Sequence, residues 1–213
     1  GPAGLGHGPI RDTLLQARYV SAEGLLVTAG GPTVKNVTGF DLCRLLVGSL
    51  GTIGLLAEVT LRTRPRPELS CWLSGEADPF ALFDRLYRPV SLLWDGTRTW
   101  LQLEGYRADV EHQTALAVAA GLEPVDGPPA LPTGRTSVEP AVLRRTAASA
   151  TPGAFVAEIG VGVVHGAWGG PLRPPAPAPV RALNRRIKAA YDPTGRLNPG
   201  RLALLGTEGT DPA

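Results

Sequence analysis

The chain has 213 residues, of which 43% are hydrophobic and 19% are charged, so it is long enough to bury a core and too apolar to be disordered. Its net charge of +2 is small and its arginines are scattered, so we do not expect it to bind nucleic acid. No apolar run reaches the roughly 18 residues of a transmembrane segment. Cys43 and Cys71 have no paired spacing, so we expect two reduced thiols.

The first third of the chain predicts a small β-rich unit. Apolar runs at 17–21 and 25–29, separated by Ala-Glu-Gly, predict a β-hairpin. A short helix is expected at 41–46, and an apolar β-branched run predicts a strand at 55–63. Arg-Pro-Arg-Pro at 64–67 ends this pattern, because proline cannot donate to a strand ladder, and we place a domain boundary there.

The middle of the chain predicts a β-α-β-β-α order. The expected elements are a strand at 69–73, a helix at 79–87, strands at 90–94 and 99–104, and a helix at 109–120. Asp95-Gly96 between the two central strands is a strong hairpin signal. This order is that of a ferredoxin-like sheet with helices on one face. The proline-containing stretch at 122–132 is expected to be a loop.

The last third mixes regular elements with proline-rich sequence. A helix is expected at 139–148, followed by strand-like runs at 154–159 and 161–164. Alternating Pro and Ala over 171–179 predicts extended polyproline II. A basic amphipathic helix is then expected at 180–191, and the polar segment DPTGRLNPGR that follows is rich in turns.

A glycine-rich segment, GSLGTIG at 48–54, leads directly into the strand predicted at 55–63. Because glycine has no Cβ, the chain can approach a ligand closely and direct N–H groups at phosphate oxygens. On spacing alone, a tight turn that enters a strand is the better interpretation.

Four motifs occur in an order that carries more information than any one of them: GPIRD at 8–12, KNVTGFDL at 35–42, GSLGTIG at 48–54 and DPTGRLNPGR at 192–201. This series resembles the FAD-linked oxidases of the vanillyl-alcohol oxidase (PCMH) type. Within them, it is most similar to the smaller FAD-binding subunit of bacterial glycolate oxidase, also called glycolate dehydrogenase.

The resemblance implies an α+β fold. It comprises the second lobe of a PCMH-type FAD-binding domain, an inserted ferredoxin-like cap domain and a C-terminal segment that returns to the flavin lobe. We expect the boundaries at 1–66 for the flavin lobe, 67–179 for the cap, 180–203 for the C-terminal helix and flavin-proximal segment, and 204–213 for a tail. The chain does not begin with Met, and no N-terminal flavin lobe precedes Gly1, so we expect a fragment that is inactive in isolation.

The resemblance also implies which residues lie near FAD: Gly8, Asp12, Gly48, Ser49, Gly51, Thr52, Gly54, Leu55 and Asn198. Contacts at Gly54 and Leu55 would be made by backbone, with the side chains of Leu55 and Leu56 in the core. We therefore expect a side chain at Gly54 to cost flavin binding more than folding.

Two of these residues have structural alternatives of similar weight. Pro199 is expected to hold Asn198 in an extended conformation, from which its amide could serve a flavin edge; an Asx turn is the alternative. Asp12 could instead pair locally with Arg11 or cap the following segment.

His165 is the residue that bears most directly on catalysis. Catalytic relatives carry two His-containing segments that together bind a divalent metal and position a 2-hydroxy acid. The matching stretch here retains His165, whereas Glu158 replaces the first His and valines replace the acidic and amide positions. One Glu and one His make a poor metal site. We therefore assign no metal site and no catalytic residue, and expect His165 to be structural.

The function implied is that of an FAD-binding subunit of a glycolate (2-hydroxy acid) oxidase complex from a bacterium, beside a catalytic flavin subunit and an iron–sulfur subunit. We expect it in the cytoplasm, or at the membrane periphery through its partner subunits, and expect it to support catalysis rather than carry it. Two alternatives stay open: an assembly subunit that has lost flavin chemistry, and a stand-alone FAD-dependent dehydrogenase of another 2-hydroxy acid.

Overall fold

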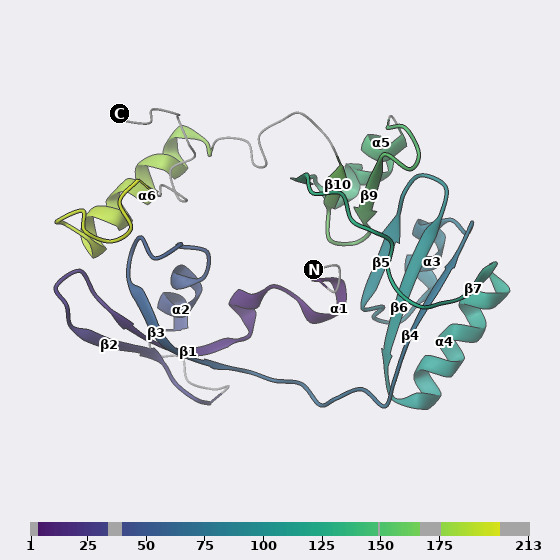
Figure 1. The fold of residues 1–213 in the computed structure, drawn as a ribbon, viewed down its shortest axis with the longest axis horizontal. Helices are drawn as coiled ribbons and strands as arrows, with labels where there is room; N and C mark the ends of the chain where they lie inside the picture. The colour runs from purple at the N-terminus through teal and green to yellow at the C-terminus, as the bar shows by residue number, and fades with distance from the viewer. Residues whose placement is uncertain (1–3, 34–39, 149, 167–175, 201–213) are drawn as a thin grey trace. The chain divides into compact units, whose positions relative to one another are not determined.

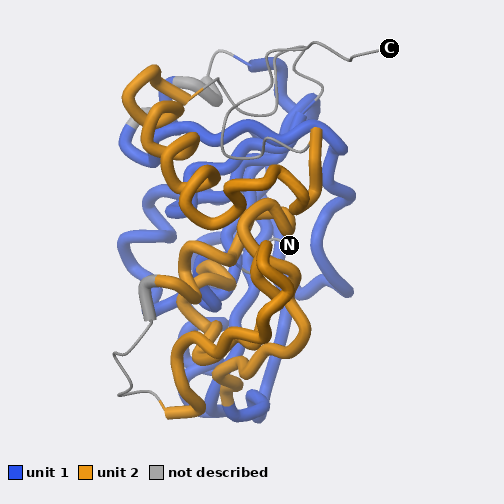
Figure 2. Tube along the Cα trace, turned by 90° about the vertical axis from the view of Figure 1, so that its left-hand side faces the viewer, with its two compact units in different colours: residues 1–8, 65–173 blue, residues 9–64, 174–213 orange. Residues whose placement is uncertain are grey.

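The structure is a computed structural model that describes residues 4–33, 40–148, 150–166 and 176–200. The chain divides into two compact units, shown in different colours in Figure 2. Unit 1 comprises Gly1–Gly8 and Pro65–Arg173, and unit 2 comprises Pro9–Arg64 and Pro174–Ala213. Within the described ranges, no helix combines the length and the hydropathy needed to cross a bilayer.

Unit 2 is built on a three-stranded antiparallel sheet with the order β2-β1-β3 (Figure 1). Its elements are η1 (Ile10–Asp12), β1 (Leu14–Val20), β2 (Leu26–Gly30), α2 (Phe40–Leu46), β3 (Leu55–Leu61) and α6 (Ala178–Tyr191). The expected first hairpin is confirmed, with the Ser21 N–H donating to the Leu25 carbonyl at 2.9 Å. The core joins the sheet to α2, and Ile187 and Tyr191 of α6 pack against it.

Helix α2 approaches this sheet closely because Gly30 lacks a side chain. A Cβ at Gly30 would lie 2.2 Å from the Leu15 carbonyl oxygen and 2.9 Å from the Cys43 Sγ. Gly30 also has a φ of +74°, which favours glycine. Cys43 is fully buried, and its thiol donates to the Ala29 carbonyl at 3.4 Å. Both cysteines are free thiols, as expected.

Unit 1 contains a seven-stranded antiparallel sheet with the order β7-β4-β6-β5-β9-β10-β8. Its elements are α1 (Gly4–His7), β4 (Leu69–Gly75), α3 (Pro79–Arg85), β5 (Ser91–Trp94), β6 (Thr99–Gly105), α4 (Arg107–Ala119), β7 (Leu122–Val125), β8 (Arg135–Ser137), η2 (Pro140–Val142), α5 (Leu143–Ala148), β9 (Phe155–Glu158) and β10 (Val163–Gly166). From β4 to β7 the elements follow the β-α-β-β-α-β order of the split β-α-β motif.

The hairpin expected at Asp95-Gly96 is confirmed between β5 and β6. Gly96 has a φ of +101°, and the Asp95 carboxylate accepts hydrogen bonds from the N–H groups of Thr97 and Arg98 at 2.9 and 2.7 Å. Asp95 therefore fixes the turn through its side chain, as Asp commonly does.

Two expectations based on proline are wrong. Residues 122–125 form strand β7 rather than a loop, because β7 lies at the edge of the sheet, where Pro124 is tolerated, and Leu122 is buried. Helix α6 begins at Ala178, so the polyproline stretch does not extend to 179, since proline is compatible with the first turn of a helix. Residues 171–175 lie outside the described residues.

Gly1–Gly8 group with unit 1, whereas the sequence placed 1–66 in one domain. The Gly6 N–H donates to the Val90 carbonyl at 3.0 Å, and a Cβ at Gly6 would lie 2.7 Å from the Val90 Cα. Glycine at this position allows α1 to contact the segment that enters β5. Leu5 adds an apolar contact with the core of unit 1.

The packing at Gly30 predicts a large cost for Gly30→Ala. Gly24→Ala is a matched control, because Gly24 has a φ of +81° but open space around its Cβ position. Both variants should lose about 1 kcal/mol from the left-handed backbone, and Gly30→Ala a further 1–3 kcal/mol, roughly, from overpacking. Chemical unfolding of the full chain measures both, and equal losses would contradict the packing at α2.

Candidate functional site

The turn at 48–54 joins α2 to β3 through backbone in the left-handed region. Gly48, Leu50 and Gly51 have φ values of +82°, +52° and +75°. Leu50 is unusual, because its Cβ makes this conformation costly, and its side chain is 56% exposed. Backbone strain of this kind persists where surrounding contacts impose it, commonly at functional sites.

The two hydroxyl residues of the turn lie inside it. Ser49 and Thr52 are each 3% exposed. The hydroxyl and the N–H of Thr52 both donate to the Ser49 carbonyl, at 2.7 and 3.0 Å, and the Ser49 N–H donates to the Leu46 carbonyl at 3.2 Å. The Thr52 hydroxyl therefore stabilises the turn itself.

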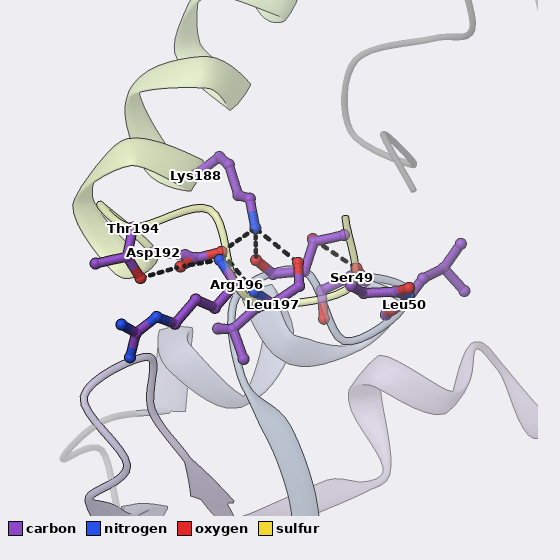
Figure 3. Close-up of polar contacts among 9 residues, drawn as sticks. Ser49, Leu50, Lys188, Asp192, Thr194, Arg196 and Leu197 are labelled. Atoms are coloured by element: carbon purple, nitrogen blue, oxygen red, sulfur yellow. Dashed lines mark hydrogen bonds and ion pairs between the residues drawn. The ribbon is translucent and has the colours of Figure 1, made fainter. Parts of the chain in front are cut away.

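Asp192 organises the loop at 192–198, which follows α6. Its N–H donates to the Lys188 carbonyl at 2.8 Å and ends the helix. Its carboxylate accepts hydrogen bonds from the Thr194 hydroxyl and from the N–H groups of Arg196 and Leu197, at 3.3, 3.0 and 2.8 Å (Figure 3). The Asp192 side chain is completely buried.

Lys188 joins this loop to the turn. Its ammonium donates to the Asp192 carboxylate, to the Leu197 carbonyl at 2.9 Å and to the Thr52 carbonyl at 2.7 Å (Figure 3). An ammonium has three donors, so all three are used. One side chain thus fastens α6, the 192–198 loop and the 48–54 turn to one another.

Asn198 makes a second contact between the loop and the turn, because its side-chain amide donates to the Leu50 carbonyl. Its φ is +43°, so the extended conformation expected from Pro199 is wrong. Asn tolerates the left-handed region better than most residues. Leu50 and Asn198, two of the three non-glycine residues with positive φ in the described part of the chain, are therefore hydrogen-bonded to each other.

The charge on Asp192 is stabilised by this arrangement. Burial would raise the pKa of its carboxyl group, but the hydrogen bonds from Lys188 and from the Leu197 and Arg196 N–H groups outweigh burial, and the pKa falls from 3.8 to about 2. Because the folded chain favours the ionised form, Asp192 contributes stability above pH 3.8 that is lost as the pH falls toward 2.

The strand after the turn does not match the sequence expectation. Leu55 and Leu56 are 63% and 46% exposed, so the prediction that their side chains lie in the core is wrong. The reason is that β3 is an edge strand. Gly54 packs against the ring of Tyr19, where a Cβ would lie 2.5 Å from Cδ2. Glycine at 54 is therefore required for folding, independently of any contact with FAD.

Gly8 and Asp12 are not part of the contact between turn and loop. Gly8 has a φ of +71° and belongs to unit 1. Asp12 belongs to unit 2, where its carboxylate pairs with Arg44 of α2 at 2.8 Å rather than with Arg11. Seven of the nine expected residues remain in or next to the turn and loop: Gly48, Ser49, Gly51, Thr52, Gly54, Leu55 and Asn198.

In unit 1, His165 pairs with Glu158 across neighbouring strands. Nε2 of His165 and Oε1 of Glu158 are 2.7 Å apart, and the two side chains are only 12% and 5% exposed. His7 and Glu104 form a looser pair at 3.4 Å. Among the residues that the structure describes, no group of three or more His, Cys, Asp or Glu side chains could hold a metal ion.

The contacts of Asp192 predict that Asp192→Asn lowers the free energy of unfolding by about 1–3 kcal/mol at neutral pH, because the Lys188 ammonium loses its counter-charge. The variant should also lose part of the pH dependence between 3.8 and 2, where the wild type is destabilised by protonation. Urea unfolding over this pH range measures both effects.

Glu58→Gln is the control for Asp192→Asn, because Glu58 pairs with Arg18 in the same unit but is 59% exposed. It should change stability by less than about 1 kcal/mol. If Asp192→Asn behaves like this control, Asp192 does not hold the loop.

Comparison with known proteins finds relatives and solved structures similar to this chain. No family model matches the chain. The chain is 33% identical over 118 residues to glycolate oxidase subunit GlcE of Escherichia coli (strain K12), which covers 52% of this chain and 34% of that protein. It is 41% identical over 68 residues to glycolate oxidase subunit GlcD of Bacillus subtilis (strain 168), covering 32% of this chain and 14% of that protein. The chain thus matches only 34% and 14% of the lengths of these two relatives.

Solved structures share the fold at low sequence identity. An alkyldihydroxyacetonephosphate synthase aligns with 94% of this chain and 55% of its own, with a TM-score of 0.60 and 11% identity. A VAO-type flavoprotein from Myceliophthora thermophila C1 aligns with 91% of this chain and 49% of its own, with a TM-score of 0.51 and 14% identity. By sequence the chain is similar to FAD-linked oxidoreductases, and its fold is that of VAO-type flavoproteins, as its motifs suggested.

Proposed function

We propose that the chain is part of the FAD-binding subunit of an oxidoreductase that acts on glycolate or a related 2-hydroxy acid. The observation that carries this proposal is the contact between the 48–54 turn and the 192–198 loop, made by Lys188 and Asn198. Both segments are motifs that resemble the flavin-proximal motifs of the family. The names of the relatives, glycolate oxidase subunits and a D-lactate dehydrogenase, support the substrate class.

The outer side of the turn suits a nucleotide cofactor. A Cβ at Gly48 would meet no atom within 4 Å, and at Gly51 the nearest atoms are 4.0 Å away, so neither glycine is required for packing. Turns that present successive backbone N–H groups form concave sites that bind anions. We propose that Gly48, Ser49, Gly51, Thr52, Gly54, Leu55 and Asn198 line the FAD site, mainly through backbone. FAD would supply the hydride chemistry and the protein its orientation.

The exposed side of β3 supports a flavin domain of more than one lobe. Leu55, Leu56, Val59 and Leu61 are 46–63% exposed on β3, which is an edge strand of its sheet in the part of the chain that the structure describes. An apolar edge of this kind normally lies against another part of a protein. We propose that β3 is covered in the assembled protein by the rest of the flavin domain, and that unit 1 is the inserted cap domain.

The Glu158–His165 pair supports a role beside a catalytic subunit. Because the His165 ring and the Glu158 carboxylate contact each other, neither is an open ligand for metal or substrate. We propose that a partner flavin subunit carries catalysis and that an iron–sulfur subunit belongs to the same complex. The same pair also favours the alternative of an assembly subunit without flavin chemistry. The flavin content of the protein distinguishes these two functions.

The gene expressed with all of its flanking coding sequence should yield a yellow protein with bound FAD. Gly51→Ala should lower the flavin content, because the new methyl group lies where the nucleotide approaches the backbone. Gly24→Ala is the matched control, since both glycines have positive φ and open space, and both variants should lose similar stability. Flavin absorbance and released FAD are measured against protein concentration.

Two outcomes of this experiment contradict the proposed FAD site. If the wild-type protein binds no FAD, its function is that of an assembly subunit without flavin chemistry. Equal flavin content in the Gly51→Ala and Gly24→Ala variants would show that the turn does not contact the cofactor.

His165→Ala should lower the free energy of unfolding by about 1–3 kcal/mol, because the buried Glu158 carboxylate loses its partner. His7→Ala should cost less, since Glu104 is more exposed and retains hydrogen bonds from Ser70 and Gln102. Below the unfolding temperature, 2-hydroxy-acid oxidation by the assembled complex with an artificial electron acceptor should be largely unchanged. A collapse of turnover without loss of stability would make His165 a catalytic residue.

A further inference from the structure

Unit 1 contains a solvent-open hollow of about 310 Å³, formed by residues of that unit. Its lining includes two carboxylates, two aromatic rings, a threonine and an arginine: Glu76, Asp78, Phe80, Trp94, Thr97 and Arg144. The volume lies at the lower end of the range for ligand pockets, so the hollow fits a group the size of a side chain rather than a nucleotide.

The aromatic wall of the hollow is held rigidly. Phe80 and Trp94 meet edge to face, with ring centroids 5.9 Å apart and planes at 76°. Trp94 makes the same kind of contact with the fully buried Phe155, at 5.9 Å and 82°. The Trp94 ring is therefore fixed between the hollow and the core. Aromatic faces carry negative potential and attract organic cations.

One cation of the chain itself, Arg144, already lies in this hollow. The Arg144 guanidinium lies 4.4 Å from the centroid of the Phe80 ring and donates to both carboxylate oxygens of Asp78, at 3.2 and 2.9 Å. This pair of contacts neutralises Asp78 and covers one aromatic ring. It shows that the local chemistry suits a guanidinium stacked on an aromatic ring beside a carboxylate.

Glu76 and Trp94 also line the hollow. Glu76 is exposed, and no hydrogen bond or ion pair links its side chain to another described residue. Its negative charge lies in the same hollow as Trp94, whereas the one lining cation, Arg144, is bound to Asp78. An anionic ligand would meet the uncompensated Glu76 carboxylate here. We propose that the hollow binds a small organic cation, an alkylguanidinium or alkylammonium group, between Glu76 and Trp94.

Titration of the full chain with n-butylguanidinium, followed by NMR at the tryptophan indole N–H groups, tests this site. Trp94→Phe identifies the Trp94 signal among the four tryptophans. The Trp94 signal should shift saturably, with a dissociation constant on the order of millimolar for so small a ligand. n-Butylurea, a neutral analogue of similar shape, should bind much more weakly. Equal binding of the two compounds, or no saturable shift, would overturn the proposal.

Glu76→Gln should weaken binding roughly fivefold, the upper range for an exposed ion pair. Glu123→Gln is the matched control, because Glu123 is exposed on β7 and does not line the hollow. If the two variants bind alike, Glu76 does not recognise the cation. A short peptide with a central arginine distinguishes the source: tighter binding than n-butylguanidinium indicates a side chain of a partner protein, and weaker binding indicates a free amine.

Discussion

The ammonium group of Lys188 is the interaction on which the candidate site depends. It is one of two lysines in the chain, and it donates to the Asp192 carboxylate and to the carbonyls of Leu197 and Thr52. Charge-assisted hydrogen bonds of this kind are stronger than neutral ones. Without them, three acceptors from two distant parts of the sequence would lose their common partner. The attachment of the loop to the turn depends mainly on this group, with Asn198 as the second contact.

The strained backbone at the site is explained by the same contacts. Leu50 and Asn198 both adopt left-handed conformations, which cost free energy outside glycine. Their hydrogen bond, together with the Lys188 contacts, imposes these conformations from both sides. The shape of the turn therefore exists before any ligand binds. A preformed backbone surface reduces the ordering cost of binding, which is a useful property in a cofactor site.

Local signals predicted much of the fold. The Asp95-Gly96 turn and the Gly-containing turn before β2 identified two of the hairpins, because the chemistry of such turns lies within a few residues. The sequence of β7 predicts a loop, because proline excludes a central strand but not an edge strand, and edge position depends on the whole sheet. The exposure of Leu55 on β3 was missed for the same reason.

The candidate site was predicted in its segments but not in its key contacts. Glycines and Asn198 mark the turn and the loop in the sequence, whereas the motifs do not single out Lys188 or Asp192 as functional. Their i, i+4 spacing was visible and could have suggested a pair. The decisive contact was not visible, because Thr52 and Lys188 are 136 residues apart. Only the fold brings them together, and a local sequence pattern carries no information about such a contact.

Amide hydrogen exchange of the full chain, wild type against Lys188→Met, tests the central claim most directly. If Lys188 fastens the loop to the turn, the amides of 48–54 and 192–198 should exchange faster in the variant. The amides of α4 in unit 1 should be unaffected and serve as the internal reference. Unchanged exchange at 48–54 would show that the turn holds its shape without Lys188 and would contradict the account.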